Sequence, residues 1–151
     1  MEQNLETFLR QKKKQQPLID WNPKKQKWLL SVNELYSAIE SWLDNLIKEN
    51  IVKISYDNLT LDEYYVAPYV IRQMNILVGY EQVRLEPKGM IVVNAVGRID
   101  MIGDDGTLKL LLMQNDDSVK FQWLIAVSKE DFPLTKVSFS EALEQVMRKN
   151  V

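Results

Sequence analysis

The sequence predicts an α+β fold in which an antiparallel meander sheet of about five to seven strands carries helices on one face. Three observations support this prediction. Apolar residues recur at helical spacing between residues 32 and 49, the period changes to two from Ile51 onward, and a second helical stripe follows near the end of the chain. The connections between strands are too short for parallel crossovers, so hairpins must join them. We therefore expect one long helix in the N-terminal half and a C-terminal helix, both packed on the same face.

The first sixteen residues have the pattern of a short helical arm. Leu5, Phe8 and Leu9 fall at helical spacing, and a basic run and then Pro17 follow them. We expect residues 1–16 to form this basic arm. No repeat and no linker rich in Gly, Pro or Ser interrupts residues 17–151, so we expect a single α+β domain there.

The segment before the long helix has no clear period. Residues 17–30 contain two Trp and two Pro, so we expect an irregular connector anchored by Trp21 and Trp28. Ser31 begins a capping-box pattern, with Glu three positions later. The long helix is therefore expected at about residues 32–49.

The sheet is expected from alternating apolar residues and turn residues. The expected strands are residues 51–56, 64–66, 70–78, 80–85, 90–102, 108–113 and 119–127. In the strand at 90–102 the odd positions are apolar and are expected to face inward. A second capping-box pattern at Ser138 predicts the start of the C-terminal helix.

The hairpin that follows residue 98 brings an acid and a base together. A two-residue turn at Asp104–Asp105 or Asp105–Gly106 puts Asp100 and Lys109 on one face of neighbouring strands. A salt bridge between them is the simple interpretation. A metal-dependent, nuclease-like or acid-based hydrolase using the Asp and Lys of residues 98–109 is an alternative. Thr107, however, stands where such a nuclease would carry its second carboxylate.

Composition excludes several kinds of catalysis. The 151 residues include no Cys and no His, so no thiolate nucleophile, imidazole base or sulfur-ligated zinc site is available. The glycines match neither the dinucleotide fingerprint nor the P-loop. We therefore assign no catalytic residue, no metal ligand and no cofactor.

Two groups of side chains are candidates for binding. Tyr64, Tyr65 and Tyr69 form an aromatic run that, with Trp21 and Trp28, could line a groove for a partner or a ligand. Packing in the core, or cover for the sheet edge, is the simpler interpretation of these rings. The second group consists of arginines on expected strands that could fix an anion: Arg72, Arg84 and Arg98.

Charge is divided unevenly along the chain. Residues 1–30 carry a net charge of +4 and the remainder −6. A basic arm beside two tryptophans is compatible with a nucleic-acid-associated accessory protein. The same charge could instead complement the acidic body of this chain or of a neighbouring copy.

The sequence therefore favours a non-enzymatic binding module whose partner is a protein, most simply a second copy of itself. Nucleic acid is a less favoured partner. The polar start at Met1 does not resemble a signal peptide, and no charge-free run is long enough to span a bilayer, so we expect a cytoplasmic protein without membrane contact.

Overall fold

The computed structural model describes residues 4–15, 21–64, 66–90, 95–114 and 120–149. Its helices are α1 (Leu5–Gln15), α2 (Trp21–Trp42), α3 (Asp44–Lys48) and α4 (Lys136–Val146). Its strands are β1 (Val52–Leu61), β2 (Tyr69–Val78), β3 (Glu81–Gly89), β4 (Gly97–Gly103), β5 (Gly106–Gln114), β6 (Phe121–Val127) and β7 (Glu130–Pro133). The described strands form one antiparallel sheet in the order β1 to β7, which confirms the predicted α+β fold with a meander sheet.

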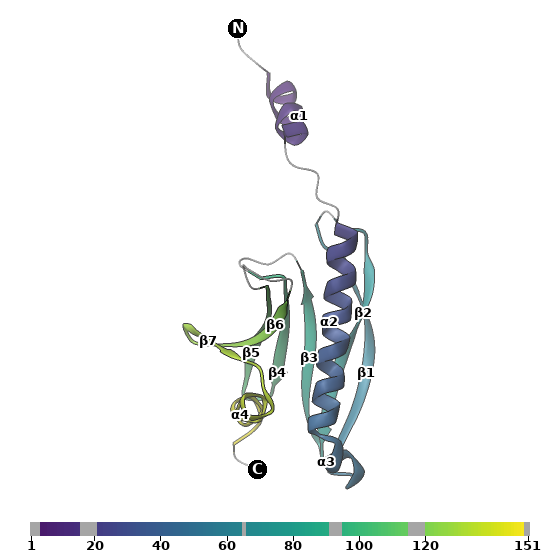
Figure 1. The fold of residues 1–151 in the computed structure, drawn as a ribbon, viewed down its shortest axis with the longest axis vertical. Coiled ribbons are helices and arrows are strands. Elements are labelled where there is room, and N and C mark those ends of the chain that lie inside the picture. Colours follow the sequence, from purple (N-terminus) through teal and green to yellow (C-terminus); the bar gives the residue numbers. More distant parts are fainter. Residues whose placement is uncertain (1–3, 16–20, 65, 91–94, 115–119, 150–151) are drawn as a thin grey trace.

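Two helices pack on the sheet (Figure 1). α2 crosses β2 and β3, and the hydroxyl of Tyr36 in its middle donates a 2.8 Å hydrogen bond to the backbone carbonyl of Arg72. α4 lies against β4 and β5, at the other half of the sheet. Both helices contribute side chains to the same apolar core.

The buried face of α2 follows from the spacing of its apolar residues. Trp28, Val32, Leu35 and Ile39 recur at steps of three and four, so they form one stripe along the helix. This stripe meets the apolar face of the sheet, where the predicted parity holds because Ile99 and its odd-numbered neighbours on β4 are buried.

The opposite face of the sheet is polar on β1 to β3. Asn75 is its centre: the side-chain amide donates to Asp57 at 2.9 Å and accepts from Gln73 at 2.8 Å and from Gln82 at 3.1 Å. Asn75 is itself buried, and these bonds satisfy its polar atoms there.

The start of the long helix differs from the sequence prediction. Residues from Trp21 onward are helical, so the expectation of an irregular connector through residue 30 is wrong. Pro23 lies in the first turn, where a helix tolerates the missing N–H, and Trp28 is completely buried against the sheet. Ser31 is therefore a buried residue inside the helix and not its N-cap.

The end of this helical region also differs. The expected helix at 32–49 is interrupted at Leu43, after which the short helix α3 begins. At the C-terminal helix the N-cap is Thr135, whose hydroxyl accepts from the backbone N–H of Ser138 at 3.2 Å. Ser138 is thus the reciprocal partner in the capping box, and the helix begins two residues before it.

The strands differ from the prediction at several places, and the strand expected at 51–56 continues as β1 to Leu61. Tyr64 and Val66 lie in the connection between β1 and β2, so the expected strand at 64–66 is wrong for its described residues. The expected break at residues 87–89 is a register shift within β3 instead. Of the strand expected at 90–102, residues 91–94 lie outside the described residues, Met90 lies after the end of β3, and β4 begins at Gly97.

The four-residue strand β7 was not predicted. Three of its residues, Glu130, Asp131 and Pro133, have low strand propensity, so only pairing with β6 defines it. The hairpin between β4 and β5 has Asp104–Asp105 as its two-residue turn, because Gly103 pairs with Gly106. In the described part of the chain no helix is both long and apolar enough to cross a membrane.

The absence of a side chain at Gly97 allows α2 to approach the sheet. A Cβ atom there would overlap the six-membered ring of Trp28, which is completely buried. We expect Gly97→Ala to lower the free energy of unfolding by about 1–3 kcal/mol in urea denaturation, because the ring and the strand must separate. Gly106→Ala is the matched control, since a Cβ there meets nothing within 4 Å, and its effect should stay within about 0.5 kcal/mol. Equal effects of the two substitutions would contradict this explanation.

Candidate functional site

Local interactions favour the helix α1. Asn4 caps it, because its side-chain oxygen accepts from the backbone N–H of Thr7 at 2.8 Å. Glu6 pairs with Arg10 at 3.2 Å one turn later, and lysines occupy the last turn, where they suit the helix dipole. These features favour a helix without any help from the sheet.

The apolar stripe of α1 is exposed to solvent. Leu5, Phe8 and Leu9 are 71%, 45% and 54% exposed, and none of the residues of α1 is buried. Figure 1 shows α1 standing apart from the sheet, beyond the N-terminal end of α2. An amphipathic helix gains stability mainly by burying such a stripe against another surface. The described part of this chain does not bury the stripe of α1.

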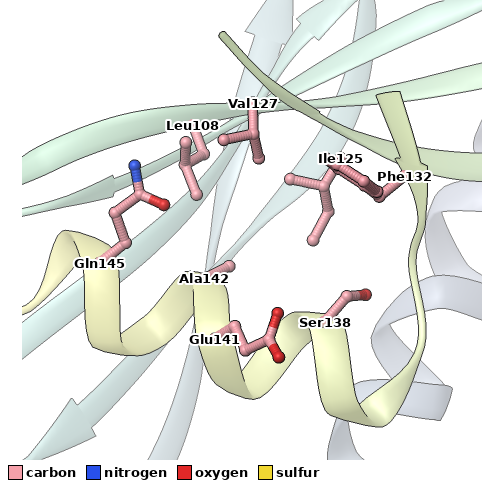
Figure 2. A pocket seen from close by; sticks show the side chains of 8 residues that line it. All are labelled: Leu108, Ile125, Val127, Phe132, Ser138, Glu141, Ala142 and Gln145. Carbon is pink, nitrogen blue, oxygen red and sulfur yellow. The ribbon is translucent and has the colours of Figure 1, made fainter. Parts of the chain in front are cut away.

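A cavity of about 190 Å³ lies beside the C-terminal helix α4 (Figure 2). We call it the α4 cavity. It is open to solvent and lies between α4 on one side and β5, β6 and β7 on the other. Its lining residues are Leu108, Ile125, Val127, Phe132, Ser138, Glu141, Ala142 and Gln145. The lining is largely apolar, and Glu141 is its only ionisable residue.

The spacing of residues on α4 explains this cavity. Ser138, Glu141, Ala142 and Gln145 recur at steps of three and four and so share one side of the helix. Phe139 lies on a different side of α4, and its ring packs on Trp42 at the end of α2, with ring centroids 5.6 Å apart. The cavity therefore receives the small and polar residues of α4, while its bulky ones fill the core.

A second cavity, of about 290 Å³, is basic and aromatic. It lies at the N-terminal end of α2, where the Lys24 ammonium is 5.4 Å from the centroid of the Trp21 ring and the Lys27 ammonium is 4.7 Å from that of Phe121. These cation–π contacts use rings that a ligand would otherwise stack on. Trp21 is thus the one predicted binding residue that lines a cavity described here.

Two of the predicted binding aromatics meet in the core. The indole N–H of Trp28 donates a 3.1 Å hydrogen bond to the hydroxyl of Tyr69, which in turn donates to the carboxylate of Glu63. Glu63 also accepts from the backbone N–H of Met90 at 2.8 Å. Burial and the bond to Glu63 raise the pKa of the Tyr69 phenol, so it remains a neutral donor at ordinary pH. This series of hydrogen bonds joins α2 to the connection after β1 and to the connection after β3. Its role is therefore structural.

The predicted arginines do not share one site. Arg72 lies under α2, with its guanidinium carbon 4.1 Å from the centroid of the Tyr56 ring and a 3.0 Å hydrogen bond to Asn33. Arg84 is exposed on β3, and Arg98 on β4 makes a two-point ion pair with Asp100. Tyr64 is exposed, and Tyr65 lies outside the described residues. The predicted set is therefore spread over several parts of the fold.

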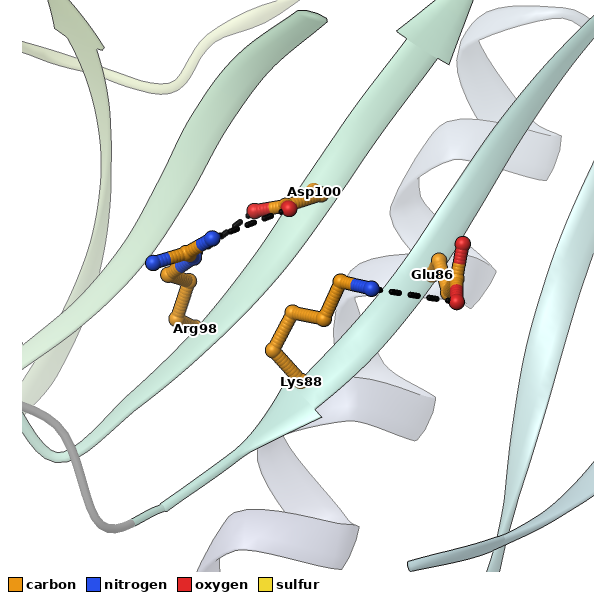
Figure 3. Close-up of polar contacts among 4 residues, drawn as sticks. All are labelled: Glu86, Lys88, Arg98 and Asp100. Atoms are coloured by element: carbon orange, nitrogen blue, oxygen red, sulfur yellow. Dashed lines mark hydrogen bonds and ion pairs between the residues drawn. The ribbon is translucent and has the colours of Figure 1, made fainter.

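The hairpin of the hydrolase alternative shows one feature that the sequence did not reveal. Asp100 is directly opposite Lys109, as predicted, but its ion pair is with Arg98, so the predicted Asp100–Lys109 bridge is wrong. On its other side Asp100 faces Glu86, which supplies a second carboxylate on the same face. Lys88 pairs with Glu86 at 3.1 Å, as Figure 3 shows.

Each of these carboxylates is therefore bound by a cation from its own strand. A metal ion would have to displace both cations. Among the described residues, no three His, Cys, Asp or Glu side chains are grouped so that they could hold a metal ion.

Comparisons with known proteins give no further guide. No protein-family model, curated protein or solved structure matches the chain. The fold and the surfaces described above are therefore the basis for any functional conclusion.

The hydrogen bonds of Tyr69 are testable. Tyr69→Phe removes the acceptor of the completely buried Trp28 N–H and one of the donors to Glu63, which keeps its bond from the backbone N–H of Met90. We expect a loss of about 1–3 kcal/mol in the free energy of unfolding. Tyr80→Phe is the control, because Tyr80 is fully exposed and should change stability by less than about 0.5 kcal/mol. A Tyr69→Phe variant as stable as the control would contradict the structural role.

Proposed function

We propose that this protein is a non-enzymatic interaction module that associates with a protein partner through α1, and that the partner includes a second copy of the chain. The observation that carries the proposal is the exposed stripe of Leu5, Phe8 and Leu9 on a helix with no buried residue. A helix of 11 residues is marginal in water on its own, and a groove that covers its apolar side stabilises it.

Charge supports the same proposal. α1 carries Arg10, Lys12, Lys13 and Lys14 against one acid, while the part of the chain after residue 30 has a net charge of −6. Association of α1 with the body of another copy therefore brings opposite charges together, which favours encounter and orientation. Helix-in-groove binding with anchors at i, i+3 and i+4 is a common mode of recognition, and Leu5, Phe8 and Leu9 have that spacing.

The mass in solution tests this proposal. We expect light scattering after size-exclusion chromatography to give the mass of a dimer at micromolar concentration. Leu9→Ser should shift the mass toward the monomer, because it places a hydroxyl in the apolar stripe. Leu30→Ser on α2 is the matched control, since Leu30 is 51% exposed against 54% for Leu9, and it should leave the dimer intact. A wild-type monomer, or equal effects of the two substitutions, would exclude self-association through α1.

A second candidate function is binding of single-stranded nucleic acid. The observation in its favour is that α1 extends from the same end of the molecule as the basic, aromatic cavity containing Trp21 and Lys24. The lysines of the two elements could contact successive phosphates, and bases could stack on the rings once Lys24 and Lys27 leave them for phosphates.

Salt dependence distinguishes this candidate. If α1 contacts phosphates, replacing Lys12, Lys13 and Lys14 by Ala should flatten the slope of log affinity against log salt by about 2 for a single-stranded oligonucleotide of mixed sequence. Fluorescence anisotropy measures the slope. The control is Lys136→Ala on α4, which lies at the other half of the fold and should leave the slope unchanged. No binding at low salt would eliminate the candidate.

A further inference from the structure

We propose that α1 of one copy binds in the α4 cavity of a second copy, with the ring of Phe8 inside the cavity and Lys12 beside Glu141. This inference rests on the proposed function, because it names the surface that α1 recognises.

The cavity suits a single aromatic ring. Its volume is about 190 Å³, and Leu108, Ile125, Val127 and Phe132 give it apolar walls. An apolar cavity of about 150 Å³ in a protein core is large enough to bind benzene. Phe132 is itself 45% exposed at this cavity, so an entering ring would also cover apolar surface at its edge.

Charge selects this cavity for a basic helix. Lys12 follows Phe8 by four residues and therefore lies on the same side of α1. Glu141 is the one ionisable residue of the cavity, and no ion pair in the described part of the chain involves it. Figure 2 shows its carboxylate beside Ser138 on α4, at the rim of the cavity, and Glu141 is exposed there, so a docked helix could reach it.

The other hollows are less suitable for α1. The cavity at Trp21 contains Lys24 and Lys27, and a larger groove beside α2 contains Lys27 and Lys120. The first has no acid, and the second has the single acid Glu34 beside its two lysines, so in both hollows α1 would meet an excess of like charge.

A fourth hollow, beside β1, contains two acids that are already engaged. Glu40 accepts from the hydroxyl of Tyr56, and Asp44 pairs with Lys48 at 2.8 Å. The unpaired acid of the α4 cavity is therefore the best complement to the cations of α1.

The reach of the chain favours a second copy as the source of α1. Residues 16–20 link α1 to α2, and this linker together with the part of α1 after Phe8 spans at most about 30 Å. α2 is about 33 Å long, and Phe139 of α4 packs on Trp42 at its far end. α4 therefore contacts α2 about one helix length from the end at which the linker enters, which is at the limit of the reach of the same chain's arm, so a second copy can supply α1 with less stretching.

The lack of Cys in the sequence makes a disulfide trap a direct test. Lys12→Cys combined with Glu141→Cys in the full chain should give, on oxidation, a covalent dimer on a non-reducing gel. The matched control pair is Arg10→Cys with Glu141→Cys, because residue 10 lies on another side of α1 from Phe8. We expect at least about ten times more covalent dimer from the first pair. Adding Phe8→Ala to it should lower the yield about tenfold by removing the anchor.

Each outcome is decisive. Equal yields from the two pairs, or a yield unaffected by Phe8→Ala, would overturn the inference. Loss of free thiols without a dimer would show that the arm binds its own body and would also overturn it. If Leu9→Ser dissociates the dimer while the Lys12→Cys, Glu141→Cys variant forms no disulfide, α1 binds elsewhere on the partner, so the proposed function stands and this inference falls.

Discussion

The contact of Trp28 with the sheet is the interaction on which the rest of the structure depends. Its ring fits against Gly97, where no side chain intervenes, and its N–H is bonded to Tyr69. On the other side the ring lies near Trp123, with centroids 6.0 Å apart. One side chain thus joins α2 to strands from both halves of the meander, and it fixes how closely the helix can approach.

This arrangement leaves the chain with unequal surfaces. α2 covers one half of the sheet with large residues, whereas α4 is only half as long and leaves the α4 cavity beside it. α1 precedes the first residue that the core holds and contributes nothing to that core. The uncovered apolar stripe of α1 and the unfilled α4 cavity are therefore two results of the same distribution of bulky side chains.

The elements that depend on local residue spacing were predicted from the sequence. The prediction was wrong for elements whose structure depends on contacts between residues distant in the sequence. The meander, a two-residue turn within residues 104–106 and the stripe of α1 are visible in the spacing of residues. The start of α2 was missed because burial of Trp28 outweighs the mixed local signal of residues 21–30. The α4 cavity was invisible because its lining comes from four elements, and the exposed Phe132 was its only local sign.

The isolation of α1 links its folding to its surroundings. A short helix with no buried residue is only partly formed in water, so its helical content follows the occupancy of whatever covers it, by mass action. The ordering of these residues then subtracts from the binding free energy, which makes a complex formed through α1 readily reversible and governed by concentration. Far-ultraviolet circular dichroism that varies with dilution would be the optical signature of this coupling.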